Sequence, residues 1–236
     1  MKVEELSQYG RTLSGLPKEA VKKQKAIVLG EIRRRFGLLG MVPFFTMVFL
    51  EQRRLVKKYP WAHQEALNLS KDAAKEITLL VAMFNLIARK DGRDKAYEFV
   101  QGIFQNVAVY SMPALYQIDE LVKCDGDVFE NFKKFNIAWF KAMNTEGTWI
   151  VDEIRDEKDE LMIVVTKCAN CVIGAAFECP EIARLGCDHD LAGYPVIVDR
   201  VNAEFRRPHT LAKGDEYCDF HFYRKGTAPD TEHLNK

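Results

Sequence analysis

The sequence predicts an α+β protein: a helical N-terminal half followed by a small antiparallel sheet with inserted helices. Up to about residue 145, apolar side chains recur every three or four positions, and after Gly147 they alternate. Hydrophobic residues make up 47% of the 236 residues and charged residues 29%, a globular balance with enough chain to bury a core. We expect residues 1–147 to be helical, and residues 148–226 to be a cysteine-bearing α/β region that forms one compact unit with them. Residues 227–236 form a polar tail.

The first helices are predicted from apolar spacing and from their start and stop signals. Residues 18–58 are expected to be helical with one break near Pro43, because proline removes a backbone donor. The apolar run 36–50 inside this segment is expected to be a buried helix. Ser70 is a candidate N-cap for the next helix, which is expected to end at Asp91-Gly92.

Two more helices and a hairpin follow. Residues 97–107 continue the helical spacing, and Pro113 is expected to interrupt it and to start a short helix. Residues 128–143 form an amphipathic helix with an aromatic stripe. Residues 149–155 and 161–167 alternate and are separated by a polar turn at Asp156-Glu157-Lys158-Asp159, so they are expected to pair as strands.

The C-terminal region adds two helix signals and two more strands. Residues 171–177 are apolar enough for a short buried helix, and Pro180 opens a second helix over residues 180–185. Residues 201–207 and 217–224 are expected to be strands connected across Lys213-Gly214-Asp215. The predicted sheet therefore has four strands.

Charge and the N-terminus bear on partners and location. The 34 Lys and Arg residues balance the 34 Asp and Glu residues, which argues against nucleic acid as the main partner. Basic runs such as Arg33-Arg34-Arg35 are expected to be a solvated helix face, with an anionic partner surface as the alternative. The charged N-terminus shows no secretory signal, so a cytoplasmic location is expected. The run 36–50 is too short to span a bilayer comfortably, so no membrane partner is expected. Whether the protein forms a homodimer is left open.

Five of the six cysteines lie in the last 70 residues. In the cytosol they are expected to be reduced, which leaves catalysis or metal binding as their use. Cys168 and Cys171 have the short spacing of zinc and redox sites. However, no second such pair is present, and the βαβ context of a thioredoxin-like motif is missing.

Three cysteines stand in more informative positions. Cys168 directly follows a predicted strand, and Cys187 has His189 and Asp190 beside it. Cys218 shares one face of its strand with two phenylalanines, so it is expected to face the core. A core-facing cysteine is often only a small hydrophobic residue, but this grouping of thiols with a carboxylate and an imidazole favours a site.

The segment from Arg207 to Phe222 resembles the C-terminal signature of the 2-aminothiazoline-4-carboxylate hydrolase family, R-x-x-T-L-x-x-G-D-x-x-C-D-F-x-F. The matching residues are Arg207, Thr210, Leu211, Gly214, Asp215, Cys218, Asp219, Phe220 and Phe222. Upstream, Cys187 and Asp190 match a C-x-x-D element, and Cys168 matches a cysteine at a strand end. The resemblance is specific over about residues 149–224.

The resemblance implies hydrolytic opening of a 2-aminothiazoline ring to a carbamoyl-cysteine, with a small-molecule substrate and no required cofactor. Such a reaction needs a nucleophile, a proton donor for the leaving atom and a cation for the substrate carboxylate. The catalytic candidates are Cys187, Cys218, Asp190 and Cys168, and the substrate-binding candidates are Arg207, Thr210 and His189. Zinc held by Cys187 and Cys218, activating a water, is the alternative to a thiolate nucleophile.

A more distant resemblance links residues 211–218 to 4-vinyl-reductase-type and phenol-sensor domains, in which three cysteines and a glutamate hold zinc. Cys187 and Cys218 correspond to two of those ligands, but Arg207 and Thr210 stand at the other two and cannot serve in the same way. A non-catalytic small-molecule-binding or sensor domain is therefore the alternative function. A third hypothesis is a protein-interaction module in which the cysteines only fill the core.

Overall fold

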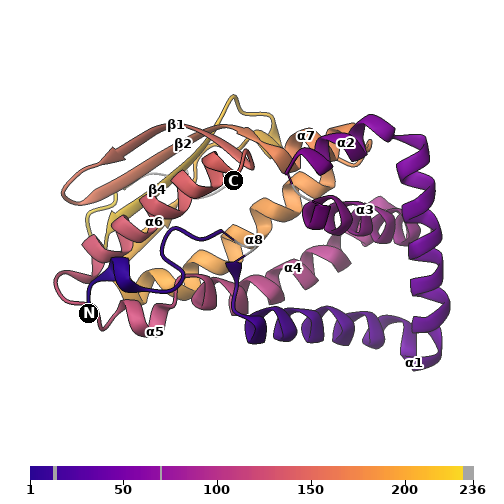
Figure 1. Cartoon of the computed structure of the whole chain (residues 1–236), viewed down its shortest axis with the longest axis horizontal. Helices are drawn as coiled ribbons and strands as arrows, with labels where there is room; N and C mark the ends of the chain where they lie inside the picture. Colours follow the sequence, from indigo (N-terminus) through magenta and orange to yellow (C-terminus); the bar gives the residue numbers. More distant parts are fainter. Residues whose placement is uncertain (13–14, 70, 231–236) are drawn as a thin grey trace.

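The computed structural model describes residues 1–12, 15–69 and 71–230, and it confirms the predicted α+β architecture. In Figure 1 the sheet lies on one side of the molecule with α5 and α6, α1 to α3 lie on the other side, and α8 runs from one side to the other. The helices are α1 (Lys18–Lys58), α2 (Pro60–Leu69), α3 (Lys71–Asp91), α4 (Arg93–Leu115), α5 (Ile118–Leu121), α6 (Val128–Thr145), α7 (Ala169–Ala176) and α8 (Glu181–Val198). Short 3-10 turns are η1 (Val3–Glu5), η3 (Asp199–Val201) and η4 (Leu211–Lys213).

The four predicted strands form one sheet in the order β1-β2-β4-β3, and each neighbouring pair is antiparallel. The strands are β1 (Trp149–Asp156), β2 (Glu160–Cys168), β3 (Ala203–Arg206) and β4 (Cys218–Arg224). The third strand is shorter than predicted, because Val201 belongs to η3 and Asn202 turns the chain with a φ of 54°.

One hydrophobic cluster lies between the inner face of the sheet, α6 and the second half of α8. Cys218, Phe220 and Phe222 on β4 are all buried, as their alternation predicts. The aromatic stripe of α6 meets them, with the rings of Phe132 and Phe222 5.3 Å apart. Aromatic side chains bury much apolar surface each, so this cluster fixes the sheet against α6 and α8.

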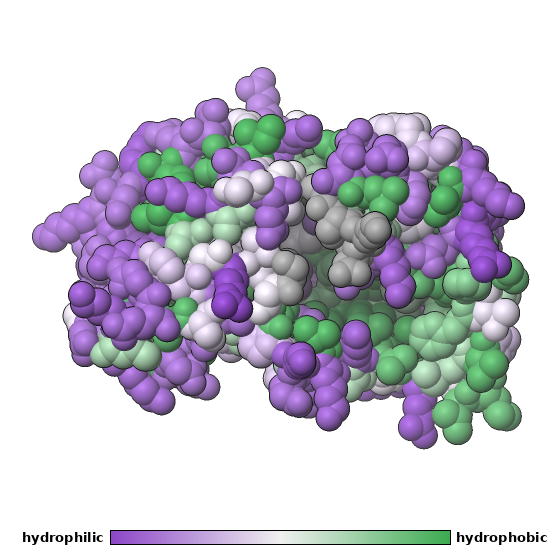
Figure 2. Space-filling view, in the orientation of Figure 1, coloured by the Kyte–Doolittle hydropathy of each residue, from purple (hydrophilic) through white to green (hydrophobic). Residues whose placement is uncertain are grey.

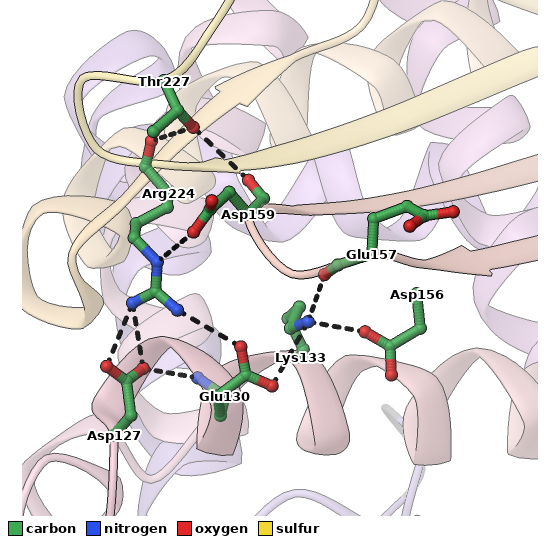
Figure 3. Close-up of polar contacts among 8 residues, drawn as sticks. All are labelled: Asp127, Glu130, Lys133, Asp156, Glu157, Asp159, Arg224 and Thr227. Carbon is green, nitrogen blue, oxygen red and sulfur yellow. Dashed lines mark hydrogen bonds and ion pairs between the residues drawn. The ribbon is translucent and has the colours of Figure 1, made fainter.

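An ion-pair network ties the first turn of α6 to the edge of the sheet, as Figure 3 shows. Asp127 caps the helix by accepting a hydrogen bond from the Glu130 backbone at 2.9 Å. The Arg224 guanidinium binds Asp127 at 3.0 Å and Asp159 at 2.7 Å, so one side chain joins β4, the β1–β2 turn and the start of α6. Lys133 is only 3% exposed and donates to Asp156 at 2.6 Å.

A second hydrophobic cluster holds α1, α2, α3, α7 and the start of α8 together. Leu185 of α8 is buried in this cluster, whereas Tyr194 of the same helix is buried in the first. Helix α8 therefore passes through both cores and connects the helical half to the sheet, along the diagonal visible in Figure 1.

Two expectations about α1 are wrong. The helix breaks at Gly37, where φ is +69° and ψ is 168°, and Pro43 lies inside its second half. A positive φ is easily adopted only by glycine, so the bend falls there. The run 36–50 is also not buried: Leu38, Leu39 and Val42 are 64%, 91% and 72% exposed. Only one face of this segment packs against other helices.

Proline positions account for two further differences. Pro113 does not start a new helix, because it lies in the last turns of α4, which runs on to Leu115. The helix expected over residues 180–185 continues to Val198 and includes Pro195, so Cys187 lies in mid-helix. The Ser70 cap lies outside the described residues. Across the part of the chain that is described, no helix is long and apolar enough to cross a membrane.

Candidate functional site

Helix α8 presents Cys187 and Asp190 one turn apart, and the loop between β3 and β4 crosses over them. Arg207, at the start of this loop, is 1% exposed. Its guanidinium donates to Asp190 Oδ2 at 3.0 Å and to the Cys187 carbonyl oxygen at 3.0 Å. A charge-assisted, buried pair of this kind ties the loop to the helix.

Thr210 joins two of the predicted cysteines. Its Oγ1 lies 3.2 Å from Cys187 Sγ and 3.6 Å from Cys218 Sγ. The Leu211 backbone N–H donates to Cys218 Sγ at 3.3 Å. Because both sulfur atoms contact the same hydroxyl oxygen, the structure brings Cys187 and Cys218 together, as the sequence analysis expects.

Residues of the family signature give the loop between β3 and β4 its compact shape. Asp215 Oδ2 accepts a hydrogen bond from the Thr210 backbone at 2.7 Å, which closes the turn around η4. Gly214 has a φ of +94°, a conformation that a side chain would strain. The segment from Arg207 to Cys218 is thus a folded unit that places the thiols.

Cys168 is the last residue of β2 and the residue before α7. Groups that favour its ionised form surround the thiol: the Cys171 thiol has the largest effect, followed by the backbone N–H groups of Cys171 and Asn170 and by the Trp149 side chain. Together these donors outweigh burial and lower the pKa of Cys168 to about 7. Donors at the first turn of a helix stabilise a thiolate in this way.

Cys168, Cys171, Cys187 and Cys218 form one thiol cluster, since Cys171 interacts electrostatically with the other three. The thiols other than Cys168 are held in the protonated form. Burial raises the pKa of Cys187 to about 11, and burial also raises the pKa of Cys218. The hydrogen bond that Cys171 gives to Cys168 raises the pKa of Cys171, which also interacts electrostatically with Cys187 and Cys218. Cys168 is therefore the thiol of this group that ionises most readily.

His189 points away from the thiols. Its Nε2 lies 3.1 Å from Ser111 Oγ on α4, and its Nδ1 lies 3.7 Å from Asp190 Oδ1. The preceding residue, Asp188, accepts a hydrogen bond from Tyr97, which is also on α4. His189 and Asp188 thus fasten α8 to α4, while Cys187 and Asp190 face the loop.

Sequence analysis missed Cys171 and Trp149 as members of the cluster. The spacing of Cys168 and Cys171 is the available signal, but without a βαβ context it does not indicate a redox site. The structure places the pair at a strand-to-helix junction without that context. Trp149 gave no signal, because only the β1–β2 register sets it opposite Cys168.

The residues that the structure describes around Cys187 and Cys218 do not form a donor set that fits zinc. Thr210 lies between the two cysteines, and Asp190 is occupied by Arg207. Within residues 1–12, 15–69 and 71–230, no group of three or more His, Cys, Asp and Glu side chains is arranged to hold a metal ion. Structural and catalytic zinc sites use at least three protein ligands. Each of the six cysteines is a free thiol.

A separate polar cluster lies on the other face of β4. Asp219 accepts hydrogen bonds from the His209 backbone at 2.7 Å and from the His221 ring at 3.2 Å, and it contacts the His209 ring at 2.8 Å. Burial opposes ionisation of Asp219, but these hydrogen bonds lower its pKa overall. Burial also opposes the charge of His221, but hydrogen bonds to Asp219 and Glu160 raise its pKa. This cluster ties His209 of the loop to Asp219 and His221 on the outer face of β4.

Comparison with protein-family models finds one family, described as L-2-amino-thiazoline-4-carboxylic acid hydrolase, which matches residues 72–222. Comparisons with curated proteins and with solved structures find no match. The matched range covers more than half of the chain and runs from α3 to β4, so it contains the whole thiol cluster. The chain belongs to the L-2-amino-thiazoline-4-carboxylic acid hydrolase family.

Proposed function

We propose that the protein is a hydrolase that opens the ring of a 2-aminothiazoline-4-carboxylate and releases a carbamoyl-cysteine. Membership of the family supports the substrate class. The observation that carries the mechanism is the Cys168 thiol, which is held at the start of α7 by donors that lower its pKa. Cys168 is the nucleophile, in place of the more strongly protonated Cys187 and Cys218.

The first step is ring opening. The Cys168 thiolate adds to the ring carbon between sulfur and nitrogen and forms a tetrahedral intermediate. The carbon–sulfur bond of the ring then breaks, and the ring sulfur leaves as a thiol after taking a proton from Cys171. Cys171 suits this role because its thiol neighbours Cys168 and its raised pKa keeps it protonated. The product of this step is an isothiourea linked to Cys168.

The second step is hydrolysis of that intermediate. A water adds across the carbon–nitrogen double bond of the isothiourea: its oxygen bonds to the carbon, and one of its protons goes to the nitrogen. The carbon–oxygen double bond then forms as Cys168 leaves as a thiolate, and the released proton returns to Cys171. One water is consumed, both cysteines regain their starting state, and the product carries a urea group.

The remaining signature residues position this chemistry. Arg207 is buried and already paired with Asp190, so we assign it to holding α8 against the loop rather than to binding the substrate carboxylate. Thr210 fixes the thiols of Cys187 and Cys218 beside the reacting pair through its hydroxyl. Substrate binding by His189 stays a prediction.

The test is the rate of ring opening in cysteine variants, followed by chromatographic separation of the carbamoyl-cysteine. Cys168→Ser is expected to lower kcat by roughly a thousandfold or more, because a serine hydroxyl is not ionised at neutral pH. Cys187→Ser is expected to lower kcat much less. Cys124→Ser is the matched control: Cys124 is buried in the first cluster, where its thiol donates to the Glu120 carbonyl and where a serine donates equally well.

Full activity of Cys168→Ser would overturn the assignment of the nucleophile. A wild-type protein that binds the thiazoline but never opens it would overturn the hydrolase proposal. That second outcome would favour the non-catalytic binding domain instead.

A further inference from the structure

The second half of α1, from Leu38 to Lys58, has two opposite faces. Phe44, Val48 and Leu55 recur at helical spacing and are buried in the second hydrophobic cluster. The opposite face carries large apolar side chains that are between 37% and 91% exposed: Leu38, Leu39, Val42, Phe45, Met47, Phe49 and Leu50. In Figure 2 these apolar side chains contribute to the hydrophobic surface at the lower right, where this part of α1 lies. Contiguous apolar surface of this kind marks an interaction site.

Basic residues flank this apolar face on both sides. Arg33, Arg34 and Arg35 precede it, before the break at Gly37; Arg34 pairs with Glu31 at 2.7 Å and Arg35 with Asp91 at 2.6 Å. The sequence has no Asp or Glu from residue 32 to residue 50. Arg53 and Lys57 follow on the same outward side of the helix and are also exposed. The nearest following acid, Glu51, is 7% exposed and is paired with Arg89 at 3.0 Å, so it faces inward.

The C-terminal end of the face also has a place for an anionic group. An open hollow of about 530 Å³ lies there. It is lined by Leu50, Arg53, Arg54, Lys57 and Lys58. The hollow therefore adjoins the apolar face. Arg54 pairs with Glu51 and Lys58 with Glu178, and the exposed Arg53 and Lys57 beside them suit a phosphate-bearing head group.

We propose that this face of α1 binds the surface of an anionic lipid bilayer, with the helix lying in the plane of the interface. Apolar side chains between basic flanks are what such helices present to acyl chains and to anionic head groups. Residues 38–50 extend over roughly 20 Å of helix, which is shorter than the hydrocarbon core of about 30 Å. The segment is thus long enough to lie on a bilayer and too short to cross one.

A second copy of the chain is a poorer occupant, because the charges repel. If two such faces packed antiparallel, Arg53 and Lys57 of each copy would lie beside the N-terminal end of the other face, where residues 32–50 hold no Asp or Glu to pair with them. If they packed parallel, each basic end would meet its own copy. Like charges brought together across an interface oppose binding. An anionic bilayer is complementary to both ends at once.

The experiment is vesicle flotation of the full chain. One set of vesicles contains phosphatidylcholine alone, and the other contains phosphatidylcholine mixed with phosphatidylglycerol. The protein is expected to float with the mixed vesicles, to bind neutral vesicles at least about tenfold more weakly, and to dissociate as salt is raised.

Two pairs of variants separate the apolar contribution from the charged one. Leu39→Glu with Val42→Glu is expected to weaken binding by roughly tenfold or more, because both side chains are exposed in the free protein and buried only in the lipid. The control is Leu79→Glu with Val109→Glu, at exposed apolar positions of α3 and α4, which is expected to leave binding unchanged.

The second pair removes charge and keeps the apolar face. Arg53→Gln with Lys57→Gln is expected to lower binding to anionic vesicles by roughly tenfold or more, whereas Lys95→Gln with Lys141→Gln, which removes two exposed cations elsewhere, is expected to have little effect.

Three results would overturn the proposal. These are no flotation with anionic vesicles, equal binding to neutral and anionic vesicles, and a dimer in sedimentation equilibrium that the Leu39→Glu and Val42→Glu pair abolishes while vesicles stay unbound. Circular dichroism of each variant checks that the helices are retained.

Discussion

Replacing Arg207 with methionine is expected to lower the free energy of unfolding by about 3–5 kcal/mol. The side chain is 1% exposed and makes two 3.0 Å hydrogen bonds, one to Asp190 and one to the Cys187 carbonyl. Methionine keeps much of the buried volume, so little of the loss comes from a cavity. The loss comes from a carboxylate that is 17% exposed and has lost its cation, and from the Cys187 carbonyl, which has lost its side-chain donor.

The measurement is urea unfolding followed by circular dichroism. Arg206→Met is the matched control: Arg206 is the neighbouring residue, its partner Glu204 is 27% exposed, and such a pair contributes about 0–1 kcal/mol. Adding Asp190→Asn to Arg207→Met should recover part of the loss, since a neutral amide is left in place of a charge. A loss of under about 1 kcal/mol in Arg207→Met, with a raised KM, would refute this reasoning and would favour Arg207 as a substrate-binding residue.

Three further predictions concern pH and packing. Because the pKa of Cys168 is lowered to about 7, kcat/KM should rise to a plateau above about pH 7, and Cys171→Ala should move this rise to higher pH by removing the main donor. The pKa of His221 is raised, so its stabilisation is full below the unfolded value of about 6.5 and is lost as pH rises through the folded value. His221→Gln should therefore cost more stability at about pH 6 than at about pH 9, measured by urea unfolding at both pH values. Gly193→Ala should lower the free energy of unfolding by about 1–3 kcal/mol, because the added Cβ would overlap Met112 of α4. Gly102→Ala on α4, where a Cβ has open space, should raise the free energy of unfolding by about 0.5–1 kcal/mol. Both changes are measured as shifts in Tm.

The strands and most helices follow from local periodicity, because alternation and three-to-four spacing are properties of neighbouring residues. The inward position of Cys218 beside two phenylalanines is of this kind. The family signature implies that Cys187 and Cys218 belong to one site. Its geometry depends on Thr210, whose hydroxyl lies between the two sulfur atoms, and no local pattern predicts that contact.

Other features depend on what packs against a segment, and the sequence of the segment does not contain that information. The run 36–50 is apolar enough for a core helix, but only the side bearing Phe44 and Val48 is covered. The break in α1 falls at Gly37 because a positive φ suits glycine, while Pro43 is tolerated inside the helix. The lowered pKa of Cys168 depends on where α7 begins, which periodicity fixes only to within a few residues.

The most direct test of the proposed mechanism is intact-protein mass spectrometry after rapid mixing with a 2-aminothiazoline-4-carboxylate and quenching in acid. The mechanism predicts a transient increase equal to the mass of the substrate, because ring opening adds the whole molecule to the thiol. Peptide mapping should place this adduct on Cys168, and Cys168→Ser should not form it. An adduct on Cys187 or Cys218, or turnover by Cys168→Ser at the wild-type rate, would contradict the mechanism.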